Sequence, residues 1–299
     1  MIQQSACEIC GAQNWGGVYS GKVRDGVFKK YREGAEVLRC GGCGAERLAE
    51  AFCLQPADYE SGEYRAKLEQ EQDIAAHNSA HDLFQKFPLD VLWPMNFRDK
   101  TIADIGCAAG TFLDHVIGTA QRCIGVEPNV FFHDYLRARG VEVYDYAADA
   151  AKALPHSVDL AVTLQVIEHT ANPRAFLAEI RPLLKPDGML LVSTPNRHDM
   201  LMSLLPDEFP SFFYRTVHRW YFEVESLKAC AKLAGYETVW VRHVHRYGLS
   251  NAMAWLRDRK PNGWNRLPGI EPAADLMWKA ILEQDGRSDN LFVCLRPAA

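Results

Sequence analysis

The 299-residue sequence lacks long hydrophobic runs, because no stretch of about 18 apolar residues is present. Its first residues also lack a basic segment followed by an apolar one. We therefore expect neither a membrane span nor a signal peptide, and we expect a cytoplasmic protein. Internal repeats and low-complexity segments are absent as well, so solenoid and fibrous architectures are excluded.

The sequence also lacks an excess of positive charge, since 33 Lys and Arg against 38 Asp and Glu give a formal net charge of −5. This balance argues against a broad nucleic-acid-binding surface. The remaining composition, 48% hydrophobic and 24% charged, is typical of a soluble globular protein. The length allows one large domain with an accessory piece, and we expect a small-molecule partner and no nucleic acid.

One central stretch changes its pattern abruptly. Residues 101–105 are apolar and β-prone, a tight turn runs from Gly106 to Gly110, and helical spacing follows. This order predicts a strand, a loop and a helix whose free N–H groups can meet a ligand. The G-x-G-x-x-G pattern of NAD-binding loops is missing, because Ala108 takes the middle position. Asp104, just before the turn, would repel a pyrophosphate but suits a cationic amino-acid tail.

Later segments extend the same pattern. Residues 123–126 predict a second strand that ends in Glu127, placed to accept hydrogen bonds from two ribose hydroxyls. The alternation of strand and helix over 101–196 predicts a parallel sheet with right-handed crossovers, whose ligands bind beyond the carboxyl ends of the strands. A doubly wound domain with an ordinary glycine turn is the alternative. Residues at the strand ends should meet in one crevice: Asp104, Gly106, Glu127 and Gln165.

Asp104-Ile-Gly-Cys-Ala-Ala-Gly110 resembles motif I of class I S-adenosylmethionine (SAM) methyltransferases, and residues 158–169 and 183–196 resemble later motifs of that family in the same order. The resemblance covers about residues 85–245. It implies an α/β fold with a Rossmann-like, seven-stranded methyltransferase sheet and SAM as the cofactor. Ala108 departs from the commoner glycine of the motif. We expect these residues to bind the cofactor: Asp104, Gly106, Ala108, Gly110, Glu127, Asp149 and Gln165.

The residue in this set that is expected to contact the adenine is one of two acids, Asp145 or Asp149. Residues 143–149 are expected to end the third strand, where an acid can accept a hydrogen bond from the adenine amino group. We choose Asp149 over Asp145 for this position.

Two Cys-x-x-Cys-Gly sequences lie near the N-terminus, one with Cys7 and Cys10 and the other with Cys40 and Cys43. Each places two thiolates on a tight turn, and four such sulfurs make a closed tetrahedral zinc site. A closed site has no open position for water, so the predicted zinc is structural. A redox pair is the alternative, disfavoured because neither motif opens a βαβ helix. Nine cysteines without a secretion signal also favour thiols and metal ligands over disulfides.

The expected organisation is a zinc-knuckle domain over 1–55, a helical linker or lid over 56–95 and a methyltransferase domain over 96–299 with an insertion at about 249–288. In the first domain, residues 18–28 predict a hairpin in which Arg24 either reaches a substrate phosphate or stays a solvated charge. In the linker, Tyr59 and Tyr64 are candidate lid aromatics. In the third domain, residues 197–218 show little periodicity and predict a long aromatic loop.

Methyl transfer is an in-line displacement at a sulfonium carbon, and a hydroxyl acceptor also needs a proton acceptor. His169, expected to face the reacting methyl group, is the first candidate for this base, although it can equally pack beneath the cofactor. His245 is the rival base. The polar residues around it are the candidate substrate contacts: Arg246, Tyr247 and Asn251.

A zinc knuckle before a SAM domain resembles a group of sugar methyltransferases of bacterial glycan and antibiotic biosynthesis, in which the zinc domain helps to close the substrate cleft. We therefore expect methyl transfer to a sugar, nucleotide-linked or part of a glycan precursor. O-methylation of a phenolic or quinone-type small molecule is the alternative, and it predicts an apolar acceptor pocket without phosphate-binding arginines. A non-catalytic scaffold and an RNA methyltransferase remain as further alternatives, the latter disfavoured by the acidic net charge.

Overall fold

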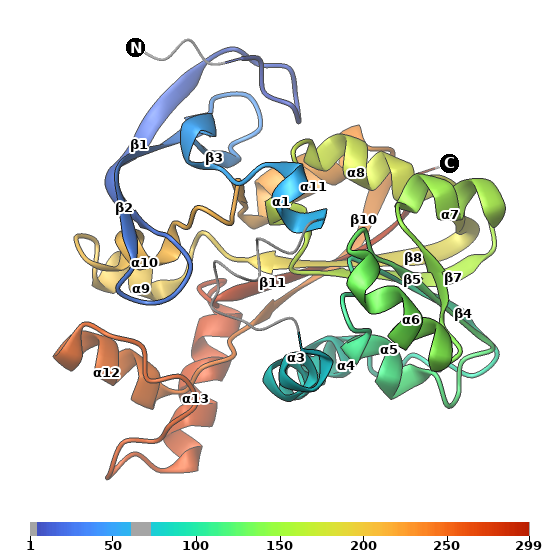
Figure 1. Cartoon of the computed structure of the whole chain (residues 1–299). Coiled ribbons are helices and arrows are strands. Elements are labelled where there is room, and N and C mark those ends of the chain that lie inside the picture. The colour runs from blue at the N-terminus through green and yellow to red at the C-terminus, as the bar shows by residue number, and fades with distance from the viewer. Residues whose placement is uncertain (1–4, 61–72, 299) are drawn as a thin grey trace.

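The computed structural model describes residues 5–60 and 73–298, and Tyr64 and the side chain of Tyr59 lie outside this description. Its centre is a mixed seven-stranded sheet, which confirms the predicted α/β methyltransferase fold (Figure 1). The strands, in spatial order, are β10 (Tyr236–Val244), β11 (Asn290–Pro297), β8 (Leu184–Pro195), β7 (Val158–Leu164), β4 (Thr101–Ile105), β5 (Arg122–Val126) and β6 (Glu142–Tyr144).

The sheet has its topological switch point at β4. From β4 the chain runs to β5 and β6 on one side and then returns to β7 and β8 on the other, and all of these neighbours pair in parallel. β11 pairs antiparallel with both β8 and β10. Ligands of open α/β sheets bind at the carboxyl ends of the strands beside such a switch point. The sheet order therefore directs attention to the loops after β4, β5 and β7.

Helices cover both faces of the sheet because the central strands are apolar on both sides. Ile102 of β4 packs in a cluster with Phe112 and Val116, whereas its neighbour Ala103 packs in the opposite cluster with Leu177. The first face carries α4 (Lys86–Leu92), α5 (Thr111–Val116) and α6 (His133–Ala138), and the second carries α7 (Ala147–Ala153), α8 (Pro173–Ile180) and α11 (Val224–Leu233). Figure 1 shows α8 and α11 above the sheet and α4 and α5 below it.

A second, smaller sheet contains the N-terminal residues. Its strands β1 (Trp15–Arg24), β2 (Tyr31–Cys40), β3 (Glu46–Leu48) and β9 (Trp220–Tyr221) pair antiparallel in this order. The predicted hairpin is present, with its turn between β1 and β2. β9 lies between α10 and α11 in the chain, so the small sheet is completed by residues outside 1–55. A continuous apolar cluster, including Ile9 and Trp220, joins the two parts.

The segment 197–218 differs from the predicted long loop, because it contains α9 (Met200–Leu204) and α10 (Phe209–Phe213). The apolar residues Leu201, Leu205, Phe209 and Phe213 recur every four positions and are buried together. Their helical period is hard to detect in the sequence because Pro206 and Asp207 interrupt it.

The remaining elements complete the chain. Between β10 and β11 the predicted insertion forms α12 (Leu249–Asp258) and α13 (Pro272–Gln284), which contact each other. None of the helices described here has the length and apolarity needed to cross a bilayer. The short helices are α1 (Pro56–Glu60), α3 (Ile74–His81) and 3-10 turns at Glu50–Phe52, Asp82–Gln85, Val130–Phe132, Ile167–His169 and Arg181–Leu183.

Candidate active site

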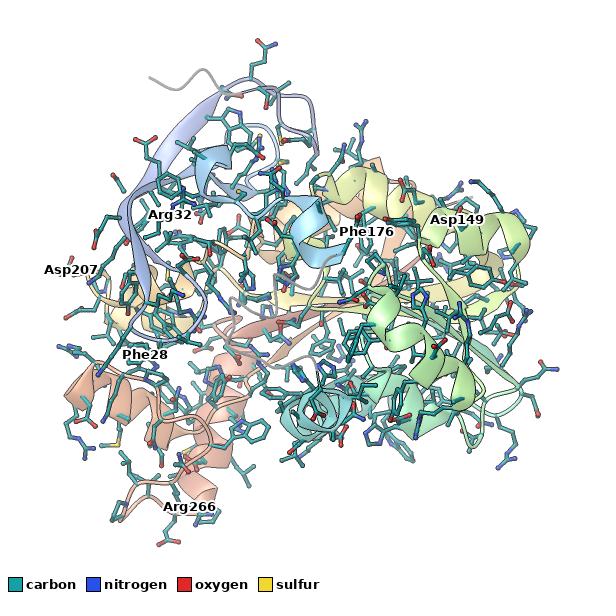
Figure 2. All side chains as sticks on the ribbon, in the orientation of Figure 1. Phe28, Arg32, Asp149, Phe176, Asp207 and Arg266 are labelled. Carbon is teal, nitrogen blue, oxygen red and sulfur yellow. The ribbon has the colours of Figure 1, made fainter. Side chains whose placement is uncertain are left out.

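A cavity of about 580 Å³ opens at the carboxyl ends of β4, β5 and β7. Its wall also includes Phe176 of α8, which Figure 2 labels above the sheet, and the 3-10 helix Asp82–Gln85. The structure brings seven of the residues predicted from the sequence to this wall: Asp104, Gly106, Ala108, Glu127, Gln165, His169 and Arg246.

The loop after β4 has the backbone conformation that its glycines predict. Gly106 has φ 81°, and a Cβ there would lie 2.6 Å from Cγ2 of Val166. Gly110 has φ 77°, and a Cβ there would lie 2.7 Å from a methyl group of Leu136. Both positions therefore require glycine. Ala108 has φ 48°, a left-handed conformation that costs a non-glycine residue about 1–2 kcal/mol, so it adopts the geometry of the commoner glycine at an energetic cost.

The carboxylate of Glu127 fixes this loop against the next strand. Its Oε2 accepts a hydrogen bond of 2.8 Å from the backbone N–H of Ala108, and its Oε1 accepts one of 2.8 Å from Asn129. The side chain is buried and lines the cavity. A carboxylate held in this way has its remaining lone pairs directed by the protein, which suits the recognition of a pair of hydroxyl groups.

Asp104 is a buried carboxyl group at the end of β4. Burial, together with the negative charge of Glu127, raises its pKa to about 8. The group is therefore largely protonated near neutral pH until a cation lies beside it. An α-ammonium group is such a cation, so the electrostatics of the site fit the amino-acid end of SAM.

Gln165 follows β7 with φ 59° and is held from the neighbouring strands. Its Nε2 donates to Oγ of Ser193 at 3.2 Å and to Oδ1 of Asn290 at 3.0 Å. Asn290 itself lines the cavity and was missed by the sequence reasoning. It lies at the start of β11, far along the chain, and only the antiparallel pairing of β11 with β8 brings it to the site.

His169 ends the 3-10 helix after β7 and reaches the same cavity. Its Nδ1 makes a short hydrogen bond to the carbonyl oxygen of Val217, and the backbone of Gln165 also hydrogen-bonds the imidazole. With the proton on Nδ1, Nε2 is the ring nitrogen that carries no hydrogen. Burial lowers the pKa of His169 to about 4; the Val217 carbonyl opposes this shift and the charge of Arg215 adds to it. The imidazole is consequently neutral at physiological pH.

Two further buried groups surround His169 and were not anticipated. Glu168 accepts a hydrogen bond of 3.1 Å from Oγ1 of Thr194, and burial raises its pKa to about 7. His218 makes an edge-to-face contact with His169, the ring centroids 4.8 Å apart. Ligand atoms of these three side chains lie within 4.8 Å of one another, but Arg215 adds positive charge beside them, which disfavours a metal cation there.

The structure contradicts the expected placement of Asp149. β6 already ends at Tyr144, and residues 147–153 form α7, so Asp149, labelled in Figure 2, lies in the first turn of this helix. Its carboxylate accepts a hydrogen bond from Lys152 at 3.4 Å. Asp145 and Tyr146 line the cavity instead. The sequence predicts that the strand continues to Asp149, whereas the residues after Tyr144 lead into the N-terminus of α7.

The candidate substrate residues also separate. Arg246 lines the cavity and donates from Nε to the Asp289 carboxylate at 2.6 Å. His245 lies off the wall, where its Nδ1 accepts from the Asp289 backbone N–H at 3.0 Å. Tyr247 and Asn251 lie off the wall too; the Asn251 side chain instead accepts from the backbone N–H of Asn262 in the insertion. The rival base is therefore a buried partner of Asp289.

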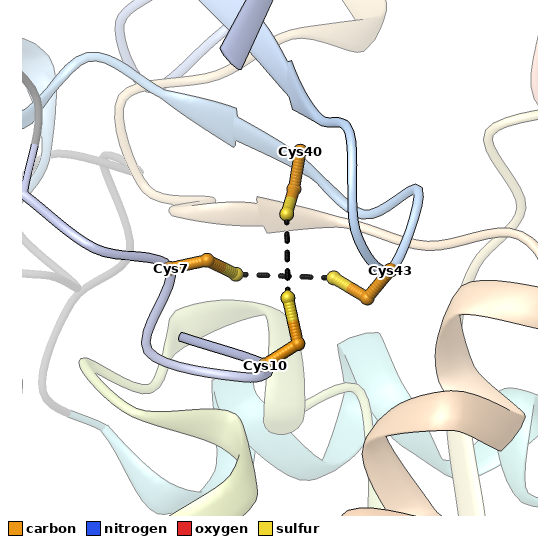
Figure 3. A group of neighbouring side chains, drawn as sticks. All are labelled: Cys7, Cys10, Cys40 and Cys43. Atoms are coloured by element: carbon orange, nitrogen blue, oxygen red, sulfur yellow. Dashed lines mark hydrogen bonds between the residues drawn. The ribbon is translucent and has the colours of Figure 1, made fainter. Parts of the chain in front are cut away.

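The four N-terminal cysteines form a separate cluster, in which all sulfurs lie within 4.8 Å of one another (Figure 3). Sγ of Cys7 lies 3.8 Å from Sγ of Cys43, and Sγ of Cys10 lies 3.5 Å from Sγ of Cys40. A tetrahedral zinc with Zn–S bonds of about 2.3 Å separates its sulfurs by about 3.8 Å, so the donor set fits zinc in number, type and spacing. The hydrogen bond between Cys7 and Cys43 lowers the pKa of Cys7 to about 5 and raises the pKa of Cys43, so the first thiolate of this pair forms at Cys7.

Comparison with known proteins agrees with this geometry. Residues 75–241, more than half of the chain, match the family described as methyltransferase domain, and the chain therefore belongs to this family. A SAM-dependent methyltransferase from Archaeoglobus fulgidus has the same fold, with a TM-score of 0.51, 16% identity and coverage of 79% of this chain and 98% of that one.

The curated relatives match only part of the chain. A ubiquinone biosynthesis O-methyltransferase from Cereibacter sphaeroides is 29% identical over 119 residues, covering 38% of this chain and 48% of the relative. A probable SAM-dependent methyltransferase from Mycolicibacterium smegmatis is 36% identical over 100 residues, covering 33% of this chain and 39% of the relative. The chain thus spans about half the length of the curated relatives it matches.

Proposed function

We propose that this chain transfers the methyl group of SAM to a hydroxyl oxygen of a small molecule, with His169 as the proton acceptor. The observation that carries the proposal is the neutral imidazole of His169, oriented by Val217, in the wall of the cavity that also holds Asp104 and Gln165. The relatives named as O-methyltransferases of ubiquinone biosynthesis support an oxygen acceptor. This proposal replaces the expected sugar acceptor with a wider class of hydroxyl acceptors, which includes the phenolic or quinone-type alternative.

The cofactor end of the cavity has a proposed role for each strand end. Asp104 accepts the α-ammonium group, Glu127 accepts the ribose hydroxyls and Gln165 contacts the methionine portion. Asp145 takes the place of Asp149 near the adenine amino group, because it is the acid on the cavity wall. When bound, SAM supplies an electrophilic methyl group on a sulfonium ion.

His169 then removes the proton of the acceptor. As the new carbon–oxygen bond forms, the acceptor oxygen becomes positively charged and its proton becomes strongly acidic. A histidine of low pKa can take this proton at Nε2, since the Nδ1–H remains bound to Val217. The buried surroundings of the imidazole exclude water from the competing reaction.

The four-cysteine cluster is proposed to hold one structural zinc ion through Cys7, Cys10, Cys40 and Cys43. The chemistry and spacing of the sulfurs support this assignment. All four coordination positions are then filled by protein, so the ion takes no part in methyl transfer and instead fixes the fold of the small sheet.

The test uses SAM with a labelled methyl group and two acceptor panels, catechol-type phenols and nucleoside diphosphate sugars. Once an acceptor is found, His169→Ala should slow single-turnover methyl transfer by roughly 10²–10⁴-fold, the usual contribution of a general base, while the affinity for S-adenosylhomocysteine changes less than threefold. The control is His198→Ala, because His198 is an exposed residue that pairs with Glu223. Methyl transfer at the wild-type rate in His169→Ala would refute the assignment of the base, and failure of the wild-type chain to bind S-adenosylhomocysteine would favour a non-catalytic scaffold.

A sugar carrying a phosphate or diphosphate remains a second candidate acceptor. The specific observation in its favour is a pair of adjacent arginines, Arg24 and Arg215, whose charges act on His218, the histidine in contact with His169.

A further inference from the structure

Arg24 and Arg215 lie side by side although 191 positions separate them in the chain. The two arginines pair in an isolated parallel bridge, in which the N–H of Arg24 donates to the carbonyl of Tyr214 at 2.9 Å and its carbonyl accepts from Thr216 at 3.0 Å. Paired residues of neighbouring extended segments direct their side chains to the same side. The small N-terminal sheet and the methyltransferase domain thus each contribute one guanidinium to a common position.

These two charges are not compensated within the described parts of the chain. In residues 5–60 and 73–298 no carboxylate forms an ion pair with either guanidinium, whereas the neighbouring Arg246 pairs with Asp289. The nearby Asp25 carboxylate instead accepts from Oγ1 of Thr216 at 2.7 Å. The Nε atoms of Arg24 and Arg215 are buried and lack a hydrogen-bond partner. Burial, together with the charge of the adjacent Arg215, lowers the pKa of Arg24 to about 9.

An aromatic ring holds one of the guanidinium groups in position. The guanidinium carbon of Arg24 lies 3.9 Å from the ring centroid of Phe212, on α10. Stacking of this kind covers the face of a guanidinium and leaves the N–H groups at its edge able to bind an anion. Adjacent unpaired donors of this type are costly to bury unless an anion binds them.

The arginine pair adjoins the proposed site of methyl transfer. Arg215 lies two residues before Val217, whose carbonyl accepts the hydrogen bond of His169. Its charge contributes to the lowered pKa of both His169 and His218, and Arg24 contributes to that of His218. Neither arginine lines the cavity itself, so an acceptor bound at His169 has to extend past His218, which contacts His169, to reach them.

We propose that Arg24 and Arg215 together bind a phosphate or diphosphate group of the methyl acceptor. Two adjacent guanidinium groups match the charge of a phosphate or diphosphate better than that of a single carboxylate. The inference rests on the proposed methyltransferase function and narrows its substrate class to phosphorylated hydroxyl compounds. It also gives the N-terminal sheet a direct part in substrate binding, because Arg24 is the last residue of β1.

The experiment is calorimetric titration of the full chain, saturated with S-adenosylhomocysteine, with inorganic diphosphate, UDP, uridine and 3,4-dihydroxybenzoate. We expect binding of inorganic diphosphate and UDP that weakens as salt is added, and no binding of uridine. Tighter binding of UDP than of inorganic diphosphate identifies a nucleotide acceptor, and equal binding identifies the phosphate groups alone; both results support the site. A preference for dihydroxybenzoate over diphosphate would overturn the proposal in favour of a carboxylate acceptor.

Variants make the test specific to the pair. Arg24→Gln and Arg215→Gln should each weaken diphosphate binding at least tenfold, whereas Arg32→Gln should change it less than twofold. Arg32, labelled in Figure 2, is the matched control because it lies opposite Val23 in the same hairpin. Its guanidinium stacks on the ring of Phe52. Arg24→Lys keeps the charge if the glutamine variant fails to fold, and it should retain weakened binding. Undiminished diphosphate binding in both glutamine variants, or none in the wild type, would overturn the site, while retained binding of S-adenosylhomocysteine shows that the cofactor assignment stands independently.

Discussion

The two ends of the candidate active site are constructed differently. At the cofactor end, the side chains follow directly on successive strands of one sheet, with Asp104 after β4, Glu127 after β5 and Gln165 after β7. At the proposed acceptor end, Arg24 comes from the small sheet and Arg215 from the segment before β9, and their charges act on His218, which contacts His169. Cofactor recognition therefore depends on local sequence patterns, whereas the proposed acceptor recognition depends on how two sheets pack. Changes that separate the two ends test this difference directly.

The largest expected effect is loss of zinc, which should damage the acceptor end alone. Wild-type protein should contain about one zinc per chain. The variant Cys40→Ser lacks a proposed ligand at the last residue of β2 and should contain almost no zinc. Because β2 pairs with the strand that carries Arg24, diphosphate binding should be lost, while S-adenosylhomocysteine affinity should change less than threefold. Metal analysis and calorimetry measure both effects.

The control for this variant is Cys53→Ser. Cys53 is a buried cysteine nearby whose thiol donates to the Leu48 carbonyl, and it lies outside the four-cysteine cluster, so the zinc content should be unchanged. A freshly reduced wild-type protein without zinc would refute the structural-zinc proposal.

The same contrast explains what the sequence could predict. Asp104, Gly106 and Glu127 were identified because a strand, its terminal acid and a glycine turn are contiguous in sequence, and backbone geometry then determines where they lie. The fold followed from the same alternation of strands and helices. Asp149 was misplaced because the boundary between a short strand and the next helix depends on packing and leaves a weak local signal.

Residues brought together by distant parts of the chain were beyond sequence reasoning. Asn290 reaches Gln165 only through the pairing of β11 with β8, and Arg215 meets Arg24 only through an isolated bridge. His245 looked equivalent to His169 in the sequence. Their difference lies in tertiary contacts, because Asp289 buries His245 whereas His169 lines the cavity.

The second prediction damages the cofactor end alone. Glu127→Ala removes the proposed acceptor of two ribose hydroxyls and also the hydrogen bonds to the N–H groups of Ala108 and Asn129. Charge-assisted hydrogen bonds contribute about 1.5–3 kcal/mol each, so we expect roughly hundredfold weaker S-adenosylhomocysteine binding in calorimetry. Glu142→Ala is the control, since Glu142 pairs with Arg122 away from the cavity wall, and it should change the affinity less than twofold. Equal affinities for wild type and Glu127→Ala would mean that the ribose binds elsewhere.

The smallest effect concerns pH and again belongs to the cofactor end. In the free protein burial raises the pKa of Asp104 to about 8, so most of the carboxyl group is protonated at pH 6. The ammonium group of S-adenosylhomocysteine favours the ionised carboxylate and lowers this pKa in the complex, so binding below pH 8 must release a proton. The affinity should therefore rise with pH, by up to about tenfold per unit between pH 6 and 8, and then level off.

Titrations at several pH values, in buffers of different ionisation enthalpy, measure both this slope and the proton release. Asp104→Asn should bind more weakly and without the slope, because the amide cannot ionise. Glu168→Gln is the necessary control, since burial raises the pKa of Glu168 to about 7, within the same window, and this variant should retain the slope if Asp104 is responsible. A slope that survives in Asp104→Asn but vanishes in Glu168→Gln would assign the released proton to Glu168. The titrating group would then lie next to His169 and not at the proposed cofactor end.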